Sequence, residues 1–163
     1  MSDLNKKSVD IESVAKKALK DGKTLKMIAY EDKVEREKSL LKREEQRRKQ
    51  AYRIIEELEL ISRWAKVDKP IIVGLVRLGL VVAPDIDLEV YSENPRIIDG
   101  FRIIAEIAES NNVVGVKFKN TMETRGKWLY WQVRYKDDSN VLWAIEIYVC
   151  GPGDPYAHWS EQF

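Results

Sequence analysis

Apolar and acidic residues alternate between Asp85 and Val90, and this is the most regular pattern in the chain. Because side chains two positions apart on a strand share a face, the pattern predicts a strand with Asp85, Asp87 and Glu89 on one face and apolar side chains on the other. Three neighbouring carboxylates repel one another unless a cation lies among them or one takes up a proton. A divalent metal explains such a row, and an amphipathic strand with a solvated acidic face explains it equally well.

Helical spacing and charge dominate the first part of the chain. A stripe of apolar residues predicts a short helix between Ser8 and Asp21. The stretch from Leu25 to Asp68 has neither Gly nor Pro and is rich in Glu, Lys, Arg, Gln and Leu, so it predicts one long helix or two. Its first half is expected to be solvated, whereas from Ala51 onward apolar residues at helical spacing are expected to lie on a core. These residues are Ile54, Ile55, Leu58, Ile61 and Ala65, with Leu60 and Trp64 beside them.

A proline then ends the helical stretch, and short strands and glycine-punctuated turns follow. Residues 71–73 predict a short strand, and residues 75–84 predict a turn that contains one helical turn. Residues 94–112 predict a helix with Asn94 or Ser92 as its cap. The stripe that this helix is expected to bury consists of Ile98, Phe101, Ile104, Ala105 and Ala108.

The last third of the chain alternates in the manner of strands. Residues 114–119 and 129–135 each predict a half-buried strand. A polar turn at 137–140 joins the second strand to an apolar run at 141–149, which predicts an antiparallel hairpin. Glu146 interrupts this run, and a lone carboxylate inside a sheet is costly unless it is paired or binds a metal. The residues expected on the buried faces are Val114, Val116 and Phe118, followed by Leu129, Trp131, Val133 and Tyr135.

Together these elements predict an α+β fold. A mixed or antiparallel sheet of about five strands carries helices on one face and is preceded by a long charged N-terminal helix. With 163 residues and 44% hydrophobic content, the chain is long enough for one domain with a sizeable core. The expected division is a helical extension over residues 1–50, the main domain over 51–150 and a tail over 151–163.

The overall charge gives no argument for nucleic acid or an acidic membrane as a partner. Lys and Arg total 28, and Asp and Glu total 27. A local basic patch lies on the long helix, and a solvated helix surface is the favoured interpretation over a phosphate-binding surface for nucleic acid. This patch consists of Lys42, Arg43, Arg47, Arg48, Lys49 and Arg53.

The single cysteine, Cys150, lies in an apolar run and predicts a buried, inert thiol, which suits a reducing cytoplasm. The N-terminal residues lack the apolar segment of a signal peptide, and no run is long enough to span a membrane. His158 is the only histidine, so neither a zinc site nor a His-based dyad is expected. The five tryptophans are expected to pack in the core or against the sheet.

The order of elements and two short motifs resemble the nucleotidyltransferase superfamily of the polymerase-beta and kanamycin-nucleotidyltransferase kind. In that superfamily a Gly-Ser pair ends the first strand, an Asp-x-Asp pair lies on the second strand, and a later central strand supplies a third carboxylate. Gly74 matches the glycine, Asp85 and Asp87 match the pair, and Glu146 is the candidate for the third carboxylate. Residues 73–91 also resemble a group of small bacterial and archaeal nucleotidyltransferase-like proteins.

The resemblance implies an enzyme that transfers a nucleoside monophosphate from an NTP to a hydroxyl acceptor, with one or two Mg²⁺ ions. Asp85, Asp87 and Glu146 would bind the metal and carry the catalysis, and Gly74 would bring the backbone close to phosphate oxygens. Arg77 has two interpretations of equal weight, a phosphate contact and a surface charge. Glu89 is expected to be solvated at the end of its strand.

Leu75 departs from the family pattern, because it stands where the family has serine and has no hydroxyl to offer a phosphate. Whether the chain is an enzyme therefore stays open, and the alternative is a catalytically degenerate protein of the same fold that acts as a binding or regulatory partner. The acceptor is not readable from the sequence. The charged helix over residues 31–50, with Val34, Leu40 and Leu41 as a thin apolar seam, favours self-association or a partner protein.

Overall fold

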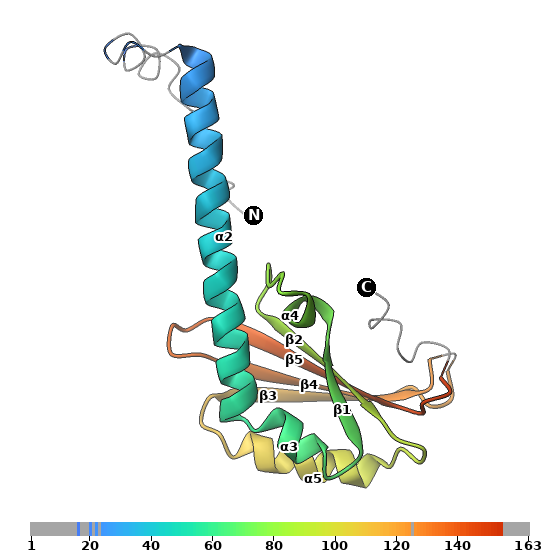
Figure 1. Ribbon diagram of the computed structural model, residues 1–163. Coiled ribbons are helices and arrows are strands. Elements are labelled where there is room, and N and C mark those ends of the chain that lie inside the picture. The colour runs from blue at the N-terminus through green and yellow to red at the C-terminus, as the bar shows by residue number, and fades with distance from the viewer. Residues whose placement is uncertain (1–15, 17–19, 21, 23, 125, 155–163) are drawn as a thin grey trace, which may run out of the picture. The chain divides into compact units, whose positions relative to one another are not determined.

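The computed structural model describes residues 24–124 and 126–154, together with positions 16, 20 and 22 (Figure 1). The short helix predicted between Ser8 and Asp21 therefore lies outside the described residues except at two isolated positions, and His158 lies outside them as well. The chain divides into two compact units, Met1–Arg43 and Glu44–Phe163. The sheet and all the candidate site residues belong to the second unit. No helix within the described residues is long and apolar enough to cross a membrane.

The stretch predicted as one or two helices forms two, α2 at Leu25–Glu57 and α3 at Leu60–Trp64. They are separated at Glu59, which adopts a left-handed conformation with φ 50°. Because the chain changes direction at Glu59, the buried face of α3 does not continue the buried stripe of α2. The predicted burial of Ile61 and Ala65 is therefore wrong, and Leu60 and Trp64, which were expected beside the stripe, are fully buried.

Five strands form one open, mixed sheet, and the predicted α+β fold with a long N-terminal helix is confirmed. The strands are β1 Lys69–Val73, β2 Asp85–Tyr91, β3 Val113–Asn120, β4 Trp128–Lys136 and β5 Leu142–Cys150. Their order in the sheet is β1-β2-β5-β4-β3, in which β2 and β5 are parallel and every other pair is antiparallel. The helical turn α4, Gly74–Leu78, connects β1 to β2, and the helix α5, Ile97–Ala108, connects β2 to β3.

The two faces of the sheet differ in composition. The end of α2 and the helices α3 and α5 supply the helical part of the hydrophobic core, and they cover the face that carries the apolar side chains of β2, β4 and β5 (Figure 1). Those side chains are Ile86, Leu88, Val90, Leu129, Trp131, Val133, Tyr135, Trp143, Ile145, Ile147 and Val149. The opposite face, called the open face below, carries the intervening residues, most of them half-exposed. The alternating pattern on β2 and β4 was therefore predicted correctly.

The face that α5 buries differs from the prediction. Gly100, Ile103, Ile104 and Ile107 are buried, whereas of the predicted stripe only Ile104 is. The reason is a close approach at Gly100, where a Cβ atom would overlap with the indole ring of Trp131. A glycine carries no hydrophobic signal, so the pattern of large apolar residues pointed to the wrong side of the helix. The predicted caps are also wrong, because the helix begins after Arg96 without a side-chain cap.

Strand β3 lies at the edge of the sheet, and its predicted burial is only partly correct. Phe118 packs against the core, but Val114 and Val116 are 58% and 43% exposed. A register shift between Val113 and Gly115 interrupts the alternation at the start of the strand. The hairpin predicted between β4 and β5 is confirmed, and Asp137 closes its turn by accepting hydrogen bonds from the backbone N–H groups of residues 139 and 141.

Candidate functional site at the start of strand β2

Gly74 connects β1 to the helical turn α4 at a position where only glycine fits. Its φ is +66°, in the left-handed region that other residues rarely adopt. A Cβ atom at this position would also overlap with the carboxylate of Asp87. The backbone of Gly74 and the side chain of Asp87 are therefore in direct contact, and Leu75 follows inside α4.

Asp87 and Glu146 face each other across the parallel strands β2 and β5. Their Cα atoms are partners in the register, and Asp85 lies two positions earlier on β2. Paired residues on neighbouring strands are about 5 Å apart and share a face. The three predicted carboxylates thus lie on the open face, on the neighbouring strands β2 and β5.

The carboxylates of β2 lie in an electrostatically unfavourable environment. Burial raises the pKa of Asp87 to about 6, and the charges of Asp85, Glu146 and Glu89 contribute to the rise. Burial also raises the pKa of Asp85, against the opposing effect of its own backbone N–H group and with help from Glu146. The Oδ1 atom of Asp85 is buried and has no hydrogen-bond partner among the described residues. A buried acceptor without a donor is uncommon, and it is the kind of atom that a bound cation would satisfy.

Glu146 has the opposite environment, because three side chains donate hydrogen bonds to it. The Tyr130 hydroxyl (3.0 Å) and the Gln132 amide (2.8 Å) donate to Oε1, and the Tyr148 hydroxyl (2.7 Å) donates to Oε2. Although burial acts to raise the pKa of Glu146, these hydrogen bonds, together with the charge of Lys117, lower it overall. Glu146 is therefore held as a fixed anion whose Oε1 is occupied, which leaves Oε2 as the atom best able to accept another group.

The three donors to Glu146 were not recognised in the sequence. Tyr130 and Gln132 lie on β4, and Tyr148 lies on β5 itself, all on the open face. The alternation of these strands assigns them to the polar face, but their common target depends on the register of the β4–β5 hairpin. That register pairs Gln132 with Glu146 and Tyr130 with Tyr148.

Two other sequence expectations concern the same segment. The prediction that Glu89 is solvated at the end of a strand is wrong, because Glu89 lies inside β2, is half-buried and accepts a hydrogen bond from the hydroxyl of Tyr91. Arg77 is exposed in the last turn of α4.

The donor set allows a test of whether a divalent cation fits. Within the described residues no group of three or more His, Cys, Asp or Glu side chains is arranged to hold a metal ion. Asp85 and Asp87 nevertheless offer hard oxygen donors, one of them buried without a partner, and Mg²⁺ is commonly held by one or two carboxylates together with water and phosphate oxygens. Asp85 and Asp87 would therefore be the main ligands of a bound cation, with Glu146 restricted to Oε2.

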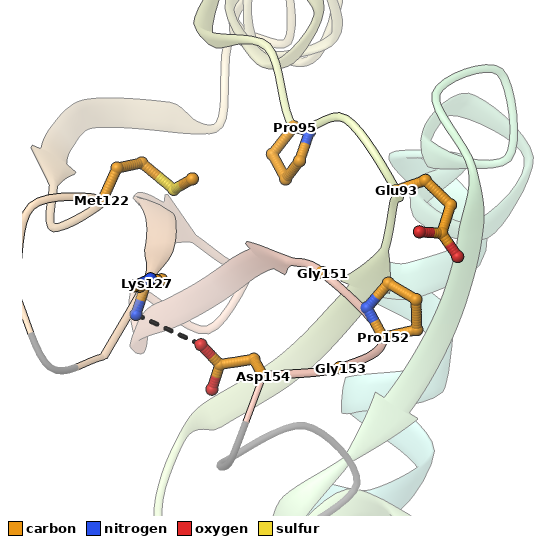
Figure 2. A pocket seen from close by; sticks show the side chains of 8 residues that line it. All are labelled: Glu93, Pro95, Met122, Lys127, Gly151, Pro152, Gly153 and Asp154. Carbon is orange, nitrogen blue, oxygen red and sulfur yellow. Dashed lines mark hydrogen bonds between the residues drawn. The ribbon is translucent and has the colours of Figure 1, made fainter.

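A cavity of about 380 Å³ lies elsewhere, beyond the ends of β2 and β5 (Figure 2). Glu93 and Pro95 line one side of it, and the backbone N–H of Lys127 donates to the carboxylate of Asp154 on the other. Asp87 lies four residues before Tyr91, where β2 ends, which separates it from this end of the strand by about 13 Å. The cavity and the carboxylate cluster are separate features.

The expectation of a buried thiol at Cys150 agrees with the structure. Cys150 is buried, and its burial raises the pKa of its thiol to about 12, so it is not a nucleophile at neutral pH. Of the tryptophans in the described residues, Trp64, Trp131 and Trp143 are fully buried and Trp128 is half-buried.

Neither the known protein-family models nor the curated proteins include a match to this chain.

Proposed function

We propose that this chain is a nucleotidyltransferase-like protein that transfers a nucleoside monophosphate from an NTP to a hydroxyl acceptor and releases pyrophosphate, with Mg²⁺ as cofactor. The observation that carries the proposal is the placement of Asp87, which lies in register with Glu146 on a parallel neighbouring strand and in contact with the backbone of Gly74. One face of the sheet therefore carries two hard-cation ligands, Asp85 and Asp87, with the fixed anion Glu146 and the backbone of Gly74 close to them. The resemblance of residues 73–91 to small nucleotidyltransferase-like proteins points to the same chemistry.

In this proposal each residue has a defined task. Asp85 and Asp87 hold the cation, which when bound would neutralise charge on the triphosphate and make the acceptor hydroxyl more acidic. Glu146, anchored through Oε1, receives the proton of the acceptor hydroxyl at Oε2. Gly74 brings backbone N–H groups close to the phosphates, and the exposed Arg77 contacts them from α4.

Isothermal titration with Mg²⁺ and each NTP tests the proposal. Wild-type protein is expected to bind at least one NTP in the presence of Mg²⁺, and Asp87→Asn is expected to weaken this binding at least about tenfold, since it removes a charged cation ligand. Glu89→Gln is the matched control, because it removes one negative charge from the same face of the same strand, two residues away. Equal losses in both variants would show that general charge, not a cation site, governs binding.

A second function is favoured by Leu75, which lies in α4 directly after Gly74 and has no hydroxyl. In this alternative the chain is a catalytically degenerate protein of the same fold that acts as a binding or regulatory partner. Leu75→Ser distinguishes the two, with Leu78→Ser on the same helical turn as the control. A large gain in NTP affinity for Leu75→Ser alone favours a damaged active site, whereas no change in either variant favours a fold with another use.

We also propose that the long helix α2 takes part in the association of this protein with a second copy or with a partner protein. Leu40 and Leu41 on α2 are 58% and 65% exposed, and we assign them to self-association or to a partner protein in the reducing cytoplasm. Replacing both with Glu is expected to shift a self-associating wild type to monomer in light scattering coupled to gel filtration. Unchanged oligomers in the variant would show that these leucines are not in the interface.

A further inference from the structure

Strand β3 leaves one edge of the sheet open, because within the described residues it pairs only with β4. The backbone N–H of Thr121 donates to the carbonyl of Trp128 at the start of β4, at 3.0 Å. Successive N–H groups of a strand point to opposite sides, and the register is constant along β3 after the shift at its start. The N–H and C=O groups of Val116, Phe118 and Asn120 therefore point away from β4, where a further strand can pair with them.

An apolar ledge, formed by Val116, Phe101 and Ile98, lies beside this edge on the face of the sheet that the helices cover. Val116 lies on that face, since it is paired with the buried Val133, and it is nevertheless 43% exposed. The ring centroid of Phe101 on α5 is 4.9 Å from that of Phe118, and Phe101 is 40% exposed. Ile98 lies three residues earlier on the same side of α5 and is 47% exposed. A strand added to β3 would cover this ledge.

The other face of the same edge is basic. Lys117 and Lys119 lie on the open face, where they are paired with Gln132 and Tyr130 of β4. No ion pair within the described part of the chain engages either lysine. A strand added to β3 places alternate side chains beside these lysines and the intervening side chains on the apolar ledge. The best complement is therefore a segment in which acidic and apolar residues alternate.

A second copy of this chain fits the edge poorly. In an antiparallel pairing of two β3 strands about a two-fold axis, registers centred on residue 117, 118 or 119 place a lysine of one copy opposite a lysine of the other. A register centred on Val116 runs into the irregularity at the start of the strand, and one centred further along pairs only its last residues. Strand β2 has the matching acidic and apolar alternation, but it is already paired on both sides, with β1 and β5.

We propose that the outer edge of β3 binds an extended acidic segment of another protein, which adds a sixth strand to the sheet. The acidic side chains of the segment lie beside Lys117 and Lys119, and its apolar side chains cover the apolar ledge. Main-chain hydrogen bonds to the outward groups of β3 supply affinity, and the alternation of side chains supplies specificity. The inference does not depend on the proposed function, in which none of these residues contacts the metal, the phosphates or the acceptor hydroxyl.

Fluorescence anisotropy with a labelled peptide of about ten residues, in which glutamate alternates with valine, tests the proposal. Wild-type protein is expected to bind this peptide saturably with a Kd below about 1 mM. Val116→Pro is expected to weaken binding at least about tenfold, because it removes an outward N–H group without removing a hydrogen bond to β4. Val116→Ala is the matched control, since it shortens the same side chain and keeps the N–H, and it is expected to stay within about threefold of wild type.

A variant outside the strand keeps the test decisive if Val116→Pro lowers the Tm. Ile98→Glu places a negative charge on the apolar ledge and is expected to weaken binding of the glutamate–valine peptide at least about tenfold. Its control is Ile61→Glu, which changes an exposed isoleucine on α3 and is expected to bind the peptide like wild type.

The charge of the partner is tested with the double variant Lys117→Gln and Lys119→Gln. It is expected to bind the glutamate–valine peptide about fivefold more weakly than wild type at low salt, since exposed ion pairs contribute modestly. It is expected to bind a glutamine–valine peptide as wild type does. Lys136→Gln, which changes an exposed lysine at the end of β4, is the control and should leave binding of both peptides unchanged.

Three results would overturn the proposal. The first is no saturable binding of the glutamate–valine peptide to wild type. The second is equal weakening by Val116→Pro and Val116→Ala in variants with the Tm of wild type, which would show that the strand edge is not used. The third is a wild-type dimer in light scattering that Val116→Pro converts to monomer, which would assign the edge to a second copy of this chain.

Discussion

We expect the ionised carboxylate of Asp87 to destabilise the folded protein. Asp87→Asn should therefore stabilise it. The substitution keeps the shape of the side chain and removes its charge. The pKa of Asp87 is raised from the ordinary 3.8 to about 6, chiefly by burial and then by Asp85 and Glu146. Since each pKa unit between the folded and unfolded states is worth about 1.4 kcal/mol, ionised Asp87 destabilises the fold by about 3 kcal/mol before solvent screening. Its partial exposure reduces this to about 2 kcal/mol.

The sign of the pH dependence follows from the direction of the shift. A carboxyl group with a raised pKa binds its proton more tightly in the folded state, so its favourable contribution is complete below pH 4. That contribution is lost as the pH rises from about 4 to about 6, where Asp87 ionises in the folded protein. The variant should therefore match wild type near pH 4 and exceed it by about 2 kcal/mol at pH 7.5. For a chain of this size the gain corresponds to roughly 4–8 °C in Tm.

Urea unfolding at pH 4, 5, 6 and 7.5 measures the effect, with the emission of the buried Trp64, Trp131 and Trp143 as the signal. Glu123→Gln is the control, because it removes one charge from an exposed loop residue and should leave the pH profile unchanged. A loss of stability in Asp87→Asn at pH 7.5, or a gain that is the same at all four pH values, would refute the reasoning. Added Mg²⁺ should stabilise wild type by about 1.4 kcal/mol at ten times its Kd and should have a much smaller effect on the variant.

Three further predictions concern single positions. Gly74→Ala should destabilise the fold by about 1–3 kcal/mol in urea unfolding, because it combines a left-handed φ with an overlap on the carboxylate of Asp87, and a neutral result would contradict that geometry. Tyr148→Phe removes the donor to Oε2 of Glu146 and should lower the transfer rate about tenfold with NTP affinity unchanged; equal loss of both, or an altered near-ultraviolet dichroism spectrum, would indicate a structural role instead. Cys150 should react with a thiol reagent only after unfolding, since burial raises its pKa to about 12, and rapid labelling of the native protein would show that the strand end opens.

The sequence predicted those features that depend on neighbouring positions along the chain. The period-two pattern of β2 defines its faces without any knowledge of the rest of the sheet, so the separation of Asp85 and Asp87 from the apolar side chains was correct. Gly74 was found for the same reason, because a glycine at the end of a strand is a local signal. The prediction of the buried helical face was wrong after Glu59. A single left-handed residue changes the direction of the chain there, and a glutamate does not indicate such a conformation in the sequence.

Features that depend on strand order were not predictable in the same way. The exposure of Val114 and Val116 follows from the position of β3 at the sheet edge, and neighbouring positions along the chain do not identify an edge. The three donors to Glu146 come from β4 and β5, whose pairing as a hairpin was predicted but whose register was not. Sequence alone could name Glu146 as an unusual carboxylate, but its partners required the register.

The position of β5 explains why Asp87 and Glu146 behave differently although they are paired across neighbouring strands. On one side β5 meets β2, whose carboxylates crowd Asp87 with like charge, and on the other it meets β4, whose Tyr130 and Gln132 stabilise Glu146 as an anion. Binding of a cation or a proton to Asp87 reduces its repulsion from the neighbouring carboxylates, whereas Oε1 of Glu146 already accepts two hydrogen bonds. A bound cation is therefore expected to change the electrostatic environment of Asp87 and to leave the position of the Glu146 side chain unchanged. The stability of the Asp87 variant and the rate of the Tyr148 variant should therefore change independently, because each reports on a different side of the same central strand.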